Sequence, residues 1–91
     1  MKVIRYQVRP EHVAENERLI ADVFRELHAT CPNGTRYLVL SLPDGTFIHV
    51  ADGEITTLES HRQFRTGINA RCLETPKTAD AKIVGEYRLN P

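Results

Sequence analysis

The segment YLVLSLPDGTFIHVAD, residues 37–52, predicts a β-hairpin. Two β-rich runs, Arg36 to Leu42 and Thr46 to Ala51, flank Pro43-Asp44-Gly45. Proline pre-sets φ and glycine accepts a left-handed conformation, so the chain can reverse its direction within these three residues.

Both faces of this hairpin are apolar. Strand alternation places apolar side chains on the two sides of each run: Leu38, Leu40 and Leu42 against Tyr37 and Val39 in the first, and Ile48 and Val50 against Phe47 and Ala51 in the second. A strand with one face in water alternates apolar with polar residues instead. We therefore expect both faces of the hairpin to be covered.

The segments before the hairpin predict a strand and a helix. Lys2 to Arg9 alternates as a strand that ends at Pro10. From Glu11 to Ala29 the apolar positions fall three, four or seven apart, which gathers them on one stripe of a helix.

The segments after the hairpin predict a second helix and a last strand. Thr56-Thr57-Leu58-Glu59 matches a capping box, so we expect a helix to start there and to turn one face inward, although Gly67 weakens its middle. The residues of that face are Leu58, His61, Phe64 or Arg65, Ile68 and Cys72. Glu74 to Ala81 is expected to be a polar loop, and Ile83, Tyr87 and Leu89 the apolar side of the last strand, with a bulge or close approach at Gly85.

The resulting order is β-α-β-β-α-β within one domain, residues 1–91. It predicts an α+β, ferredoxin-like fold: a four-stranded antiparallel sheet with two helices on one face. The other face of the sheet is left bare, while the hairpin is apolar on both sides. We therefore expect a homodimer that forms through the helix-free face.

Composition excludes several kinds of partner. Twelve basic and twelve acidic residues give a formal net charge of zero, so no general field attracts nucleic acid or an anionic membrane. The opening MKVIRYQVRP is charged, and no stretch approaches the length of a membrane span, which favours a soluble cytoplasmic protein. Cys31 and Cys72 do not make a metal motif, and there is no phosphate-binding glycine loop. We expect no metal, flavin or other cofactor.

His61 is the first candidate for chemistry, because its place on the apolar stripe points it at the sheet. Phe64 and its apolar neighbours would supply the wall of a pocket there. His49 alternates with Phe47 and Ala51, and the sequence leaves open whether it faces the helices or the dimer seam. Each histidine has an ordinary alternative role, in the core or at an interface.

Tyrosines add candidates for ligand binding. Tyr6, Tyr37 and Tyr87 could line a pocket with phenolic donors, although each has a plain alternative as a packing residue with one wet tip.

Three short segments resemble a known family, the antibiotic biosynthesis monooxygenase domains of the dimeric α/β-barrel superfamily. They are the end of the first strand, Val8-Arg9-Pro10-Glu11; the third strand, Phe47-Ile48-His49-Val50-Ala51; and Leu58-Glu59-Ser60-His61, which is similar to the family's Ala-Leu-x-x-His helix start. The resemblance implies a ferredoxin-like protomer, two sheets packed back to back as a dimeric α/β barrel, and a pocket between each sheet and its helices. The family includes cofactor-independent oxygenases for aromatic polyketides or quinols, haem-degrading enzymes and proteins without an assigned reaction.

The sequence also departs from the family's pattern. The frequent Glu-x-Trp at the end of the third strand would fall near His49 to Ala51, where neither residue is present. A second histidine often follows the first, but Arg65-Thr66 stands there. By position, only His61 carries over.

Two functions follow as hypotheses. In the first, the chain is an oxidoreductase, a cofactor-independent monooxygenase in which His61 or a tyrosine positions or deprotonates a small aromatic or quinol-type substrate. In this hypothesis His61 is catalytic, and Tyr6, Tyr37, His49 and Phe64 bind the substrate. In the second, the same fold is a non-catalytic module that binds a small apolar molecule or serves only for dimerisation.

Overall fold

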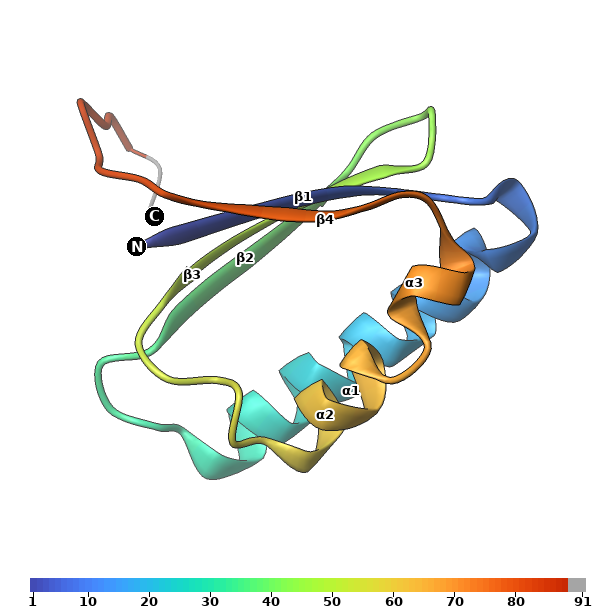
Figure 1. Ribbon diagram of the computed structural model, residues 1–91. Helices are drawn as coiled ribbons and strands as arrows, with labels where there is room; N and C mark the ends of the chain where they lie inside the picture. The colour runs from blue at the N-terminus through green and yellow to red at the C-terminus, as the bar shows by residue number, and fades with distance from the viewer. Residues whose placement is uncertain (89–91) are drawn as a thin grey trace.

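The computed structural model describes residues 1–88. Its elements, in chain order, are β1 (Lys2–Val8), η1 (Pro10–His12), α1 (Val13–Thr30), β2 (Arg36–Ser41), β3 (Thr46–Asp52), α2 (Glu59–Arg65), α3 (Ile68–Arg71) and β4 (Cys72–Asp80). The strands form one sheet in the order β2-β3-β1-β4, and each neighbouring pair is antiparallel. All the helices lie on one side of this sheet (Figure 1). The predicted α+β, ferredoxin-like arrangement is confirmed, with an open sheet whose edges are β2 and β4.

The predicted hairpin is confirmed as β2 and β3. Leu38 pairs with Val50 and Leu40 with Ile48, so these residues share one face. At the turn, Gly45 has φ 86° and donates its backbone N–H to the carbonyl of Leu42. A side chain could not replace it, because a Cβ at Gly45 would lie 2.7 Å from the carbonyl oxygen of Val8. The turn therefore packs directly against the end of β1.

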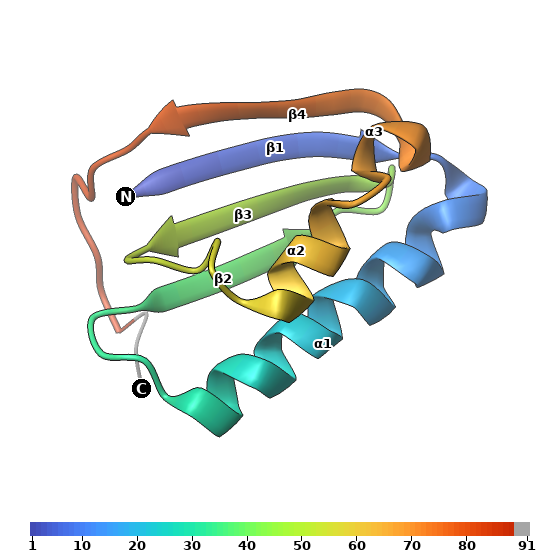
Figure 2. The ribbon, with the colours of Figure 1, turned by 60° about the horizontal axis from the view of Figure 1, so that its bottom comes forward.

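The first helix is also confirmed, with its opening residues wound as the 3-10 turn η1. Asn16, Ile20 and Val23 are the buried residues of α1 and face the sheet. Cys31 ends the helix in a left-handed conformation, φ 45°, and donates its N–H to the carbonyl of Leu27. Figure 2 shows α1 running obliquely below the sheet, with α2 beside it. None of the helices within residues 1–88 has the length and apolar character needed to cross a membrane.

The second helical segment differs from the prediction in its start and its length. No side chain of the segment 56–59 caps α2, and Thr56 instead donates both its N–H and its hydroxyl to the carboxylate of Glu54. The capping-box prediction is therefore wrong, and α2 begins three residues later, at Glu59. Gly67, with φ 77°, then breaks the segment into α2 and α3. Cys72, predicted on the helix face, is the first residue of β4.

The prediction for the C-terminal strand is wrong. The supposed polar loop is β4, and Ala81 to Arg88 form neither helix nor strand. As an edge strand, β4 pairs only with β1 and is exposed at most of its positions, so burial does not impose an apolar alternation. An edge also tolerates Pro76, which lacks a backbone donor.

The apolar alternation further on does not mark a strand. Tyr87 is 83% exposed and Val84 93% exposed. Irregular register occurs in the pairing of β1 with β4, between Arg5 and Val8, and not at Gly85. Leu89, which the prediction included in that strand, lies outside the described residues.

The two faces of the sheet differ in their cover. Tyr6, Val8 and Phe47 point toward the helices and are nearly inaccessible. Leu38, Leu40 and Leu42 alternate to the opposite side and are 45%, 46% and 38% exposed. Within residues 1–88 nothing covers this opposite, helix-free face. We call it the bare face.

Candidate functional site

A cavity of 430 Å³ lies between the helix side of the sheet and the segment that carries α2 and α3. Its lining is largely apolar, with aliphatic side chains from Ile4, Ile55 and Ile68. The structure places all five candidate site residues in this lining: Tyr6, Tyr37, His49, His61 and Phe64. Tyr87 is not among the lining residues. The fold thus brings together side chains from β1, β2, β3 and α2, although their roles remain predictions.

His49 stands at the centre of the sheet wall of the cavity. It alternates with Phe47 and Ala51 toward the helices, which settles the face that the sequence left open. Its ring is held between two phenols: the Tyr6 hydroxyl lies 2.7 Å from Nε2, and the Tyr37 hydroxyl lies 2.5 Å from Nδ1. Only 3% of the residue is exposed. Burial, and next the nearby His61, lower the pKa of His49 from 6.5 to about 4, so the imidazole is neutral at pH 7.

The hydrogen bonds continue from Tyr6 into the core. Asn16 Nδ2 donates to the Tyr6 hydroxyl over 2.9 Å, and Arg71 Nε donates to Asn16 Oδ1 over 3.3 Å. The other guanidinium nitrogens of Arg71 donate to the backbone carbonyls of Phe64 and Thr66. These contacts satisfy a cation that is only 5% exposed. We call the series Arg71, Asn16, Tyr6, His49 and Tyr37 the buried chain.

Sequence reasoning missed two members of the buried chain, Asn16 and Arg71. A signal for both was present. Asn16 falls on the same helical stripe as Ile20 and Val23, and Arg71 follows Ile68 by three positions. A polar residue within an apolar stripe predicts a buried polar contact, but the stripe alone does not name the partner.

Both tyrosines of the buried chain remain protonated phenols. Burial raises the pKa of Tyr6 and of Tyr37 above the ordinary value of 10, and it is the largest cause for each. Each hydroxyl therefore has one proton to donate and an oxygen that accepts.

His61 occupies the helix wall of the cavity, in the first turn of α2. It is 8% exposed, and its Nδ1 is buried without a hydrogen-bond partner within residues 1–88. Burial lowers the pKa of His61, and Arg65 lowers it further, against a smaller opposing effect of Glu54. His61 is thus a neutral imidazole whose ring makes no hydrogen bond to the protein within residues 1–88.

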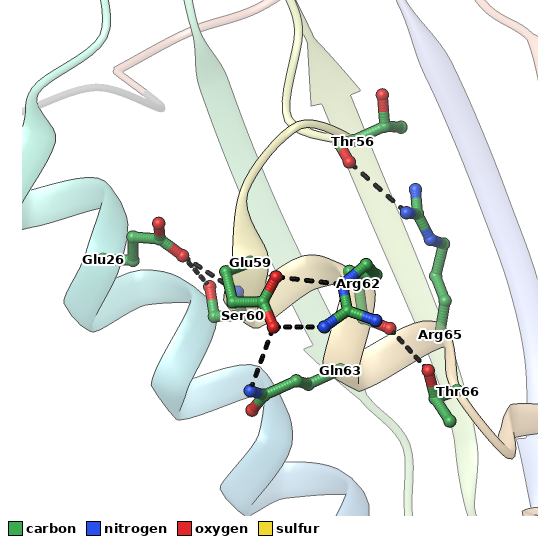
Figure 3. Close-up of polar contacts among 8 residues, drawn as sticks. All are labelled: Glu26, Thr56, Glu59, Ser60, Arg62, Gln63, Arg65 and Thr66. Atoms are coloured by element: carbon green, nitrogen blue, oxygen red, sulfur yellow. Dashed lines mark hydrogen bonds and ion pairs between the residues drawn. The ribbon is translucent and has the colours of Figure 1, made fainter.

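The position of His61 depends on how α2 is attached to α1 (Figure 3). Glu26 of α1 accepts from the backbone N–H of Ser60 over 2.9 Å and from its hydroxyl over 2.5 Å. These two hydrogen bonds lower the pKa of Glu26. On the outer side of α2, Arg62 pairs with Glu59. Arg65, which also lines the cavity, donates to the carbonyl of Thr56. A side chain from the neighbouring helix therefore supplies the cap that α2 lacks in its own sequence.

The two walls of the cavity carry groups that can exchange a proton or a hydrogen bond with a bound molecule. Within residues 1–88, no three His, Cys, Asp or Glu side chains are grouped so as to hold a metal ion. The walls instead present a neutral imidazole on one side and a phenol hydroxyl on the other. Such a pair can accept a proton from a bound molecule and donate a hydrogen bond to it.

The chain is similar in fold to several solved structures. One is described as an antibiotic biosynthesis monooxygenase: TM-score 0.70, 12% identity, covering 92% of this chain and 97% of that one. Rv0793 from Mycobacterium tuberculosis gives a TM-score of 0.71 at 13% identity, covering 93% and 94%. A candidate antibiotic biosynthesis monooxygenase from Caulobacter crescentus CB15 gives 0.69 at 15% identity, covering 90% and 88%.

No protein-family model matches the sequence, and no curated protein matches it either. At these identities the structural likeness shows a shared fold. The chain shares the fold of these solved structures over nearly its whole length.

Proposed function

We propose that the chain is a cofactor-independent monooxygenase that oxidises a small aromatic or quinol-type molecule in the cavity, with His61 as the proton acceptor. The observation that carries the proposal is a neutral histidine, His61, in the wall of an aromatic-lined cavity, with neither ring nitrogen hydrogen-bonded to the protein within residues 1–88. A substrate hydroxyl or acidic C–H in the cavity would meet the edge of the ring that lines it.

The reaction requires only the substrate, molecular oxygen and a base. For an anthrone-type substrate, His61 takes a proton from the acidic CH₂ group and leaves a carbanion. The carbanion gives an electron to O₂, the carbon–oxygen bond forms, and the proton returns from the imidazolium to give a hydroperoxide. The O–O bond then breaks with loss of water, so one oxygen atom becomes the product carbonyl and the other leaves as water.

The cavity supports a substrate of this kind. Its volume lies within the range of about 300–1,000 Å³ that small-ligand pockets occupy. Phe64 stands between the two histidines, with ring centroids 5.3 Å from His49 and 5.8 Å from His61. Flat aromatic molecules pack well against such rings.

Oxygen uptake tests the proposal. A panel of quinols and anthrones is offered to the parent, to His61→Ala and to His28→Ala, which alters an exposed histidine of α1. We expect uptake by the parent and by His28→Ala, and a rate about 100-fold lower or more in His61→Ala, the usual effect of losing a general base. Equal rates in all three proteins would reject His61 as the base.

The second candidate is a non-catalytic module that binds a small apolar molecule. One observation favours it: within residues 1–88 no side chain forms a hydrogen bond with either ring nitrogen of His61, whereas a catalytic base is usually oriented by a third group. Binding of quinols without any oxygen uptake by the parent would select this function.

We also propose that two copies of the chain pair through the bare face. Leu38, Leu40 and Leu42 would be covered by the same surface of a second copy, as in a two-fold symmetric dimer. Burial of apolar area contributes roughly 25 cal/mol per Å², so a few hundred Å² would stabilise the pair substantially.

Sedimentation velocity tests this pairing. Leu40→Glu would place an unpaired charge in the interface and should convert a dimer into a monomer. Ala29→Glu, on the exposed side of α1, is the matched control and should leave the dimer intact. A parent that sediments as a monomer at micromolar concentration would remove the proposal.

A further inference from the structure

Arg71 determines which group donates and which accepts in each hydrogen bond of the buried chain. A guanidinium has only N–H donors, so the atom that faces Nε must be an acceptor. Arg71 is held in place by the carbonyls of Phe64 and Thr66, and it lies over the Phe64 ring at 5.6 Å. The amide oxygen of Asn16 therefore faces Arg71, and the amide NH₂ faces Tyr6.

This orientation decides where the proton of Tyr6 goes. The Tyr6 oxygen accepts from Asn16 Nδ2, and its other neighbour is His49 Nε2. Tyr6 is 2% exposed, so a hydroxyl proton that pointed elsewhere would be buried without an acceptor. Tyr6 therefore donates to Nε2, which must carry a lone pair.

The hydrogen bond between His49 and Tyr37 has the same direction of donation. A neutral imidazole has one N–H and one lone pair, so the proton of His49 resides on Nδ1. Nδ1 then donates to the Tyr37 oxygen. Within residues 1–88, the Tyr37 hydroxyl has no other hydrogen-bond partner, so its own proton has no acceptor in the protein. Tyr37 lines the cavity.

We propose that Arg71 and Asn16 are positioning residues that fix the Nδ1–H tautomer of His49 and so leave the Tyr37 hydroxyl as a donor to an oxygen of the bound molecule. The ligand is then an aromatic compound with a carbonyl or phenolate oxygen. Its oxygen faces the sheet wall, and its acidic hydrogen faces His61 on the helix wall. The oxygen contact deepens the proposed function and rests on it, whereas the tautomer of His49 is a property of the empty protein.

The first test measures that tautomer directly. In long-range ¹H–¹⁵N NMR spectra of the parent at pH 7, the nitrogen with the lone pair resonates far downfield of the protonated one. We expect Nε2 of His49 to be the downfield nitrogen. A downfield Nδ1 would overturn the proposal, whatever the protein catalyses.

Asn16→Asp is a nearly isosteric change, distant from His49, that should reverse the direction of the hydrogen bonds in the buried chain. A carboxylate beside Arg71 stays ionised and only accepts, so it would accept a hydrogen bond from the Tyr6 hydroxyl in place of His49 Nε2. His49 would then donate from Nε2, and Nδ1 would accept from Tyr37. We expect Nδ1 of His49 to become the downfield ¹⁵N resonance and Nε2 the upfield one. A merely structural role of Asn16 would not produce this change. An unchanged tautomer in a folded Asn16→Asp protein contradicts the proposal.

Binding of two probes tests the donor. 1-Tetralone and tetralin have the same carbon skeleton, and only the former has a carbonyl oxygen. We expect Tyr37→Phe and Asn16→Asp each to weaken 1-tetralone binding about tenfold, the equivalent of about 1.4 kcal/mol, and to leave tetralin unaffected. Equal losses for both probes would show that Tyr37 only packs. Absence of oxygen uptake would reject the monooxygenase and leave these binding results standing.

Discussion

The sheet wall and the helix wall of the cavity each carry one buried histidine, and they use it in opposite ways. On the sheet wall, both ring nitrogens of His49 are bound by tyrosine hydroxyls. On the helix wall, Nδ1 of His61 has no partner within residues 1–88. Burial keeps both rings neutral. His49 therefore belongs to a hydrogen-bond network within the protein, whereas the ring of His61 has hydrogen-bonding capacity that the described residues do not use.

The largest expected effect is on the pH dependence of stability. The unfolded His49 binds a proton near pH 6.5, whereas the folded one does so only near pH 4. Between these values the unfolded state holds the extra proton, so stability is present above pH 6.5 and falls as the pH drops toward 4. At 1.36 kcal/mol per pKa unit, the loss is about 3 kcal/mol.

Urea unfolding at pH 7 and at pH 4.5 measures this loss. Carboxylates also lose contacts in acid, so the comparison is made against His49→Phe, which lacks the titrating ring. We expect the parent to lose more stability than His49→Phe over this range. Parallel losses in the two proteins would mean that His49 is not held neutral by the fold.

The next largest effect is on the free energy of unfolding at constant pH, compared between variants of the two histidines. His49→Phe leaves the Tyr6 proton without an acceptor in the core, which should cost about 2 kcal/mol of unfolding free energy. His61→Phe removes a polar atom that has no partner, so the change should stay within about 1 kcal/mol and can even stabilise. Denaturant midpoints at pH 7 give both values. If His61→Phe is as destabilising as His49→Phe, the helix wall holds a bonded histidine after all.

The sequence predicts the sheet wall better than the helix wall. In β1 the two-residue period places Tyr6 and Val8 on one face, and the pairing of Tyr6 with Phe47 extends that face to β3. The period does not determine which face the helices cover, so the side on which His49 lies follows only from the packing of β3 against the helices. The helix wall depends on contacts distant in sequence: Arg71 and Asn16 are 55 positions apart.

The wrong predictions for the start of α2 and for β4 have the same physical origin. A capping box is a local signal, but the amide of Ser60 is bound by Glu26, which lies 34 positions earlier. Edge strand β4 needs only the hydrogen bonds of one neighbour, so its polar composition resembled a loop. Where a tertiary contact replaces a local one, the sequence pattern predicts the wrong boundary for a helix or strand, although the fold can still be predicted.

The smallest expected effect concerns that tertiary cap on the helix wall. Glu26→Gln keeps the shape of the side chain and an oxygen that accepts, but it removes the charge that strengthens both hydrogen bonds from Ser60. We expect faster hydrogen exchange of the Ser60 amide and a shift of the His61 ring resonances, because the start of α2 is held less firmly. The sheet wall should be unaffected.

Glu59→Gln is the matched control, since it neutralises the adjacent carboxylate, which pairs with Arg62 on the outer side of α2. It should leave the exchange of the Ser60 amide unchanged. The pKa of Glu26 is lowered in the folded protein, so its contribution is present above the unfolded carboxyl pKa and disappears as the pH falls through the lowered value. Acidification of the parent should therefore reproduce the faster exchange seen in Glu26→Gln at neutral pH. If both glutamine variants accelerate exchange equally, net charge near α2 is the cause, and the contact between α1 and α2 does not position His61.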